Sequence, residues 1–122
     1  MDIFTTYGER VVKCENYSRS MLQILCERGL LASAIIASDI EGECKPVVAY
    51  AKCRSRDTFS PERGMKISSS KAQLKLHKKR LNTLISVRRA LEKELEAIDE
   101  ILAKEVSQVG YQSASLEVIE NY

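Results

Sequence analysis

Few side chains in this 122-residue sequence have the types and spacing that a catalytic or metal site needs. The single histidine, His77, falls among the apolar positions of a helical pattern, where a histidine more often packs or responds to pH than binds a metal. The four cysteines, Cys14, Cys26, Cys44 and Cys53, form no C-x-x-C pair, so their spacing does not suit a structural zinc ion. We therefore expect no metal ligands and no cofactor.

The cysteines also bear on the compartment. The N-terminus has neither the basic region nor the apolar core of a signal peptide, which predicts a cytoplasmic chain with reduced thiols. Cys14 and Cys26 are then expected to be small apolar residues on the face of a helix. A Cys44–Cys53 disulfide is the alternative, and it would need an oxidising compartment that no other feature supports.

Two short motifs resemble ion-binding loops without completing them. Asp39, Glu41 and Glu43 surround Gly42 as in half of a calcium loop, but the closing bidentate glutamate is missing. Residues 60–66 contain a glycine and a lysine at the wrong spacing to cradle a phosphate. No motif combines a nucleophile, a base and an orienting group, so we expect the protein not to be an enzyme.

The element with the clearest pattern is a long helix near the C-terminus. Ser70 and Gln73 stand three residues apart, as in a capping box. Residues 71–109 contain no glycine or proline, and Gly110 is suited to end a helix. The sequence thus predicts a polar loop over 54–69, a long amphipathic helix over 70–109 and a tail over 110–122. The tail is expected either to dock as a short helix or strand or to stay free for a partner.

The apolar residues of the long helix repeat every 3.5 positions, which is typical of a coiled coil. The predicted oligomer seam comprises Leu74, Leu81, Leu84, Leu91, Leu95, Ile98 and Leu102. We expect coiled-coil-like pairing within or between chains. The alternative is an amphipathic helix that packs only against its own domain.

The N-terminal part, residues 1–53, is predicted to be mostly helical. Apolar residues recur every three or four positions over 9–28, and Gly29 would stop that helix. The apolar runs 30–40 and 47–53 are too short for their period to decide, and we favour two short helices with Pro46 at the start of the second. A small β-hairpin within 34–52 is the alternative. The fold class is therefore mainly α, in a single domain.

Charge is segregated although the net charge is only +2. Residues 1–65 contain nine basic and nine acidic side chains; residues 66–90 contain eight basic and no acidic ones; residues 91–122 contain two basic and eight acidic ones. This order opposes the helix macrodipole, so helix stability does not account for it. An antiparallel pair of helices would place each basic half along an acidic half, and we therefore favour antiparallel self-association.

The basic segment is also the candidate surface for an anion or another partner. Its cations are Lys71, Lys75, Lys78, Lys79, Arg80, Arg88 and Arg89. Phosphate contacts need only such side chains on an accessible face, but no aromatic residue lies between Phe59 and Tyr111 to stack on a base.

We therefore expect a non-catalytic interaction protein, a small regulator or adaptor that self-associates and binds another macromolecule. A protein is the favoured partner. In its small size and lack of catalytic motifs the chain resembles accessory proteins of phages and mobile elements. One alternative is a nucleic-acid-binding regulator that uses residues 66–89, and another is a structural subunit of a larger assembly. No apolar run is long enough to span a membrane, so no membrane partner is expected.

Overall fold

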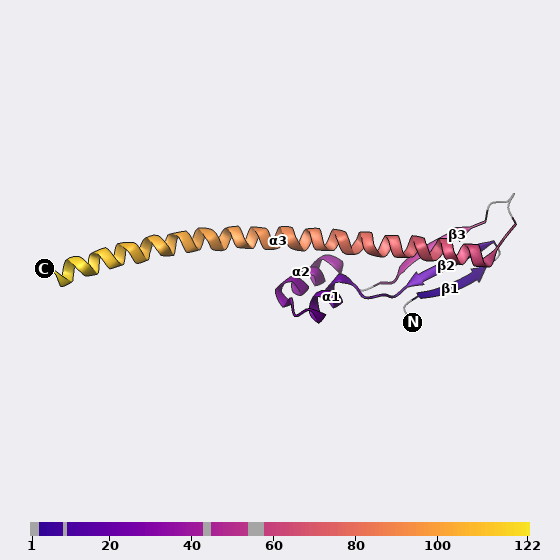
Figure 1. Cartoon of the computed structure of the whole chain (residues 1–122), viewed down its shortest axis with the longest axis horizontal. Coiled ribbons are helices and arrows are strands. Elements are labelled where there is room, and N and C mark those ends of the chain that lie inside the picture. The colour runs from indigo at the N-terminus through magenta and orange to yellow at the C-terminus, as the bar shows by residue number, and fades with distance from the viewer. Residues whose placement is uncertain (1–2, 9, 43–44, 54–57) are drawn as a thin grey trace. The chain divides into compact units, whose positions relative to one another are not determined.

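The computed structural model of the chain describes residues 3–8, 10–42, 45–53 and 58–122 (Figure 1). The fold is mainly helical and also contains a small sheet. In chain order its elements are β1 (Ile3–Gly8), β2 (Val11–Asn16), α1 (Met21–Glu27), α2 (Leu31–Glu41), β3 (Val47–Lys52) and α3 (Pro61–Glu120). The chain divides into two units, Met1–Val87 and Arg88–Tyr122, which are described separately below.

The three strands form an antiparallel sheet in the order β1-β2-β3. Cys14 of the central strand lies opposite Thr5 on one side and Ala49 on the other. Alternate residues of β2 are buried, namely Val12, Cys14 and Asn16, as the two-residue period of a strand requires. The predicted helix over 9–28 is therefore wrong in its first half, where the spacing of Val11 and Cys14 also fits a helix.

The second apolar run of the N-terminal part, 47–53, is also a strand and not the predicted helix. Its partner is β2, whereas the proposed hairpin paired it with 34–38. Residues 34–38 lie inside α2, as the favoured helical interpretation of this run predicted, because the alanine-rich run around Ala34 and Ala37 favours a helix. Pro46 lies just before β3 and does not begin a helix.

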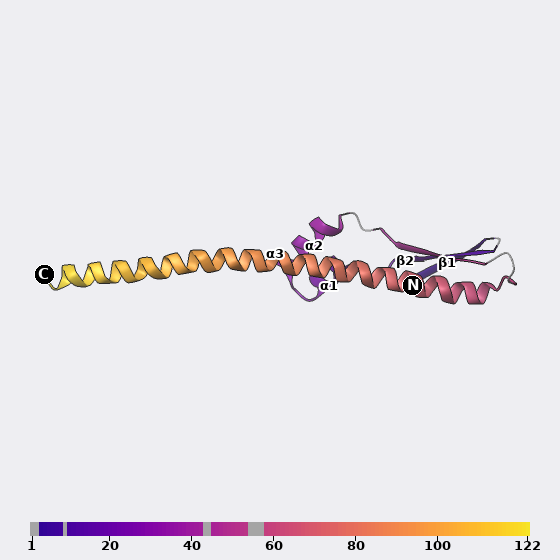
Figure 2. The same ribbon diagram turned by 90° about the horizontal axis from the view of Figure 1, so that it is seen from above.

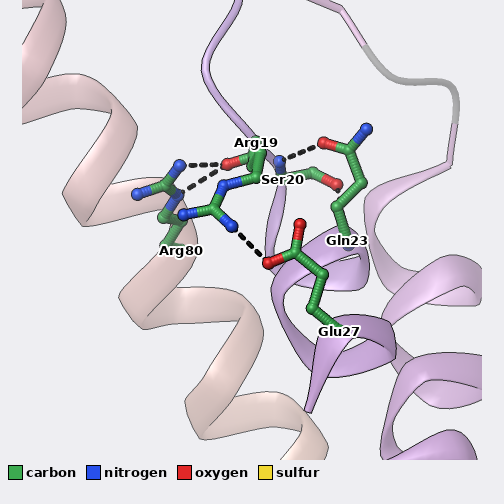
Figure 3. A network of polar contacts seen from close by, with 5 residues as sticks. All are labelled: Arg19, Ser20, Gln23, Glu27 and Arg80. Carbon is green, nitrogen blue, oxygen red and sulfur yellow. Dashed lines mark hydrogen bonds and ion pairs between the residues drawn. The ribbon is translucent and has the colours of Figure 1, made fainter. Parts of the chain in front are cut away.

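Local hydrogen bonds define the start and the end of α1. Ser20 and Gln23 form a reciprocal capping box. The Ser20 amide donates to Gln23 Oε1 at 2.9 Å (Figure 3), and the Gln23 amide donates to Ser20 Oγ at 3.3 Å. The Met21 amide donates to Glu41 Oε1 at 3.0 Å, so Glu41 supports the start of α1. Gly29 has a φ of +74° just after α1, where the sequence predicted a stop.

Helix α3 is longer than predicted at both ends. Ser60 caps it by accepting a hydrogen bond from the Arg63 amide (3.3 Å), and Pro61 occupies the first helical position. Residues 61–69 are therefore helical and not loop, Ser70 lies inside the helix, and Gly110 does not end it. The tail continues α3 to Glu120. Residues 54–57 of the predicted loop, and the Glu43 and Cys44 of the motifs above, lie outside the described residues.

Small residues allow α3 to lie close against one face of the sheet (Figures 1 and 2). Gly64, Ser68 and Ala72 follow one another at four-residue intervals and are all buried. Ala72 packs with Cys14 and Ala49 in the core. Cys14 is thus buried on a strand and not on a helix, and Cys26 is exposed on α1.

Candidate interaction surfaces

In the unit Met1–Val87, the predicted seam residues of α3 face away from the sheet. Leu74 and Leu81 are each 56% exposed, although Ala72 and Leu76, which lie two positions before and after Leu74, are buried. Residues two positions apart lie on nearly opposite sides of a helix, so one side of α3 covers the sheet and the other presents leucines. The seam is therefore available to a partner without disturbing the core.

In the unit Arg88–Tyr122, a row of apolar side chains runs along the helix without cover from the described chain. Leu95, Ile98 and Leu102 are each more than half exposed. The row continues beyond the predicted seam to Val109, Leu116 and Ile119, which keep the same heptad phase. This extension lies beyond the predicted seam, because Gly110 was expected to end the helix.

Charges along the same unit do little to stabilise an isolated helix. Arg88 and Glu92 form an ion pair of 3.1 Å between Nε and Oε1. Glu92, Glu96 and Glu100, however, follow each other at four-residue spacing, and like charges at that spacing are destabilising. Since helices in water depend mostly on the packing of an apolar face, the exposed apolar row of this helix is a candidate surface for a partner.

The charge segregation also appears at the heptad positions that flank the seam. With Leu74 at position a, the e and g positions of the first half include Lys71, Lys78 and Arg80. The corresponding positions of the second half include Glu92, Glu94 and Asp99. In an antiparallel coiled coil, e meets e and g meets g, so each set would oppose the other.

The seven predicted anion-binding cations do not form one patch. Lys71 Nζ donates to the carbonyl of Tyr50 (3.3 Å), and Lys75 Nζ donates to that of Val48 (2.8 Å), so both lie at the outer edge of β3. Arg88 is paired with Glu92 as described. Lys78 and Lys79 follow Lys75 by three and four positions and line one shallow pocket with it, whereas Arg89 belongs to the other unit.

Arg80 connects α3 to the segment that precedes α1. Its Nε donates to the Arg19 carbonyl at 2.8 Å, and its Nη2 donates to the same oxygen, while the Arg19 side chain pairs with Glu27 (Figure 3). Burial lowers the pKa of the Arg80 guanidinium, and the Arg19 charge lowers it further, while Glu41 opposes both effects. Arg80 therefore has a structural role in addition to its place beside the seam.

The outer face of the sheet carries an aromatic cluster that the sequence analysis missed. Phe4 and Tyr17 meet edge to face, with ring centroids 5.4 Å apart. Tyr17 donates its phenolic hydrogen to Glu15, which also pairs with Lys13 at 2.7 Å. These hydrogen bonds lower the pKa of Glu15, that from Lys13 most, and the bond to Glu15 raises the pKa values of Lys13 and Tyr17. An alternating pattern over 3–17 could have revealed the cluster.

A cavity of about 390 Å³ lies beside the first turn of α3, between that turn and the end of β3. Cys53, Arg63 and Phe59 are among its lining residues. The Cys53 thiol accepts a hydrogen bond from Arg10 Nη2 at 3.2 Å. Among the described residues, no group of three histidine, cysteine or acidic side chains could hold a metal ion.

None of the described helices combines the length and the apolar character needed to cross a membrane. A scan against protein-family models, a search of the curated proteins and a search of the solved structures each found no match to this chain.

Proposed function

We propose that the protein is a non-catalytic interaction protein that self-associates through antiparallel pairing of α3 and thereby presents its sheet-containing unit to another macromolecule. The observation that carries this proposal is the exposed apolar row of α3. The residues of this row are Leu74, Leu81, Leu84, Leu95, Ile98, Leu102, Val109, Leu116 and Ile119.

The size of the row argues for a partner helix. Burying one leucine or isoleucine side chain contributes about 1.5–3 kcal/mol. The burial of several such side chains per chain would therefore stabilise an assembly by far more than the burial of one isolated apolar residue on the surface. Scattered exposed apolar residues are ordinary, but apolar residues at most of the a and d positions, with His77, Arg88, Glu105 and Gln112 as the exceptions, have the form of a coiled-coil seam.

The charges favour a second copy of this chain as the partner. Lys71, Lys78 and Arg80 would approach Glu92, Glu94 and Asp99 of another copy in the antiparallel arrangement, in e–e and g–g pairs. A parallel arrangement would instead pair g positions with e positions, which places the like charges Glu94 and Asp99 together and leaves Lys78 opposite the uncharged Gln73. Complementary flanking charges select orientation more than they add affinity.

An exchange of charges tests the orientation. Lys78→Glu alone places like charges together in the antiparallel pair and weakens assembly, and so does Glu92→Lys alone. The double variant with both changes restores opposite charges and recovers the dimer. Arg80 stays unchanged because it also holds the Arg19 carbonyl.

The measurement is molar mass by light scattering over a dilution series, with circular dichroism to confirm that each variant is folded. Assembly that withstands Lys78→Glu, or that the double variant of Lys78→Glu with Glu92→Lys does not recover, would contradict antiparallel pairing. High salt should weaken the wild-type dimer because it screens exposed charge pairs.

A further inference from the structure

The outer face of the three-stranded sheet is open and aromatic. Residues that alternate with the buried ones lie on this face, and their cross-strand neighbours place Phe4 beside Glu15 and Lys13 beside Tyr50. Phe4 is 55% exposed, Tyr17 50% and Tyr50 48%. Exposed aromatic rings that gather on one small sheet lower the solubility of a protein, and such patches mark binding surfaces. The three half-exposed rings therefore make this face a candidate binding surface.

The rings are held in defined positions. The edge-to-face contact of 5.4 Å fixes Phe4 against Tyr17, and the hydrogen bond to Glu15 fixes the Tyr17 hydroxyl. Tyr50 lies on the far strand, one pleat along from the Phe4 row. From ideal strand spacings, Tyr50 and Phe4 are about 12 Å apart, which leaves their faces available to separate planar groups.

The charge of this face suits a polyanion. Glu15 is the sole carboxylate in β1, β2 and β3 as described, and Lys13 and Tyr17 both bind it. Lys52 is exposed on the same face. Lys71 and Lys75 extend from α3 to the carbonyl oxygens of Tyr50 and Val48, which places two more exposed cations at the edge next to Tyr50. Their Nζ distances to these oxygens are 3.3 and 2.8 Å.

We propose that this face binds single-stranded nucleic acid, with bases stacked on Phe4, Tyr17 and Tyr50 and with phosphates near Lys52, Lys71 and Lys75. Aromatic side chains supply stacking for any base, and neighbouring cations follow the backbone. A duplex keeps its bases stacked on each other and offers no free face to these rings, so the site selects single strands.

The fold removes the objection that the basic segment of α3 has no aromatic residues. The rings come from residues 4, 17 and 50, and the sheet places Tyr50 beside Lys71 and Lys75 and holds Phe4 and Tyr17 across the same face. The site lies within the unit Met1–Val87 and on the face of the sheet that α3 does not cover. Its aromatic residues lie apart from the α3 seam, and of its cations only Lys71 also stands at a position that flanks the seam, so the site goes beyond the self-association proposed above.

Fluorescence anisotropy with a labelled 12-nucleotide single strand, and with a duplex of equal length, tests this site on the full chain. The single strand should bind more tightly than the duplex. Tyr50→Ala should raise the dissociation constant about tenfold, whereas Tyr50→Phe, which keeps the ring, should leave it nearly unchanged. Three phosphate contacts predict a slope of roughly −2 for log affinity against log salt.

Tyr111→Ala is the matched control, because Tyr111 is an exposed aromatic residue in the other unit. It should not change the affinity. Equal affinity of wild type and Tyr50→Ala, or equal binding of strand and duplex, would overturn the proposal. Light scattering of Tyr50→Ala should give the wild-type molar mass, so a failure of this site is distinguishable from a failure of self-association.

Discussion

A β-carbon placed on Gly64 would lie 2.6 Å from Cγ2 of Val12 and 3.3 Å from its Cβ. Val12 is fully buried, and its branched side chain has little freedom to move aside. The close approach of α3 to the sheet therefore depends on the absence of a side chain at this position. This contact also fixes which side of α3 is covered and which side remains for a partner.

Gly64→Ala should destabilise the protein although alanine favours a helix. The clash with Val12 is expected to cost about 1–3 kcal/mol, which exceeds the gain in helix propensity of about 1 kcal/mol. Gly110→Ala is the matched control, because no atom lies within 4 Å of a β-carbon there and the substitution should stabilise α3. Urea unfolding of both variants measures the difference, and a stabilised Gly64→Ala variant would contradict the packing described.

Ser60→Ala and Ser70→Ala should have opposite effects. Ser60 accepts the Arg63 amide at the start of α3, and the loss of such a cap costs about 1 kcal/mol. Ser70 lies exposed inside the helix, where alanine should gain about 0.5 kcal/mol. Thermal unfolding compares the two, and a larger loss at Ser70 would place the helix start where the sequence analysis first put it.

The two serines show what the sequence could reveal. Both Ser60-Pro61 and Ser70 with Gln73 fit the start of a helix, and only the packing of Gly64 and Ser68 on the sheet selects the earlier one. The existence of a long helix was predictable from its periodicity. Its ends were not, because capping signals are local and tertiary contacts decide among them.

The three-stranded sheet is the main feature that the sequence did not predict. Val11 and Cys14 are spaced for a helix, while Val12 and Cys14 are spaced for a strand, so a short segment satisfies both periods. The pairing of β2 with β3 joins segments more than thirty residues apart, which no local pattern specifies. The aromatic cluster depends on that pairing and was missed with it.

Arg80→Ala should destabilise the unit Met1–Val87 by about 1 kcal/mol, because two donors to the Arg19 carbonyl are lost. Arg80→Lys should recover part of that loss, since an ammonium group supplies one directed bond in place of two. Chemical unfolding measures both. A neutral Arg80→Ala variant would show that the link between α3 and the start of α1 does not contribute.

Tyr17 should ionise above its ordinary pKa of 10.0, because the hydrogen bond to the Glu15 carboxylate favours the neutral phenol. A raised folded-state pKa means that this contact stabilises the fold below pH 10 and is lost as the pH rises through the raised value. Glu15→Gln should lower the pKa of Tyr17 toward 10.0. Titration of the tyrosine resonances by NMR measures the change, and an unchanged Tyr17 pKa would show that the bond is absent in solution.

The same contact has an acid limit. The hydrogen bonds from Lys13 and Tyr17 lower the pKa of Glu15 from its ordinary value of 4.5. Its contribution to stability is therefore present above pH 4.5 and declines as the pH falls through the lowered value. Glu15→Gln should make stability less dependent on pH in that range, which urea midpoints at successive pH values measure. An unchanged loss of stability at low pH in Glu15→Gln would contradict a contribution from these hydrogen bonds.

The central claim is that the exposed apolar row of α3 pairs with another copy of the chain, and the molar mass of Leu95→Gln tests it most directly. Leu95 lies in the row, whereas Ala97, two positions on, lies on the opposite side of the helix. Each dimer would lose two buried leucines at about 2 kcal/mol each, so its dissociation constant should rise about a thousandfold. By light scattering, the wild type and Ala97→Gln should be dimers and Leu95→Gln a monomer at micromolar concentration. A monomeric wild type, or a dimer that withstands Leu95→Gln, would contradict the account.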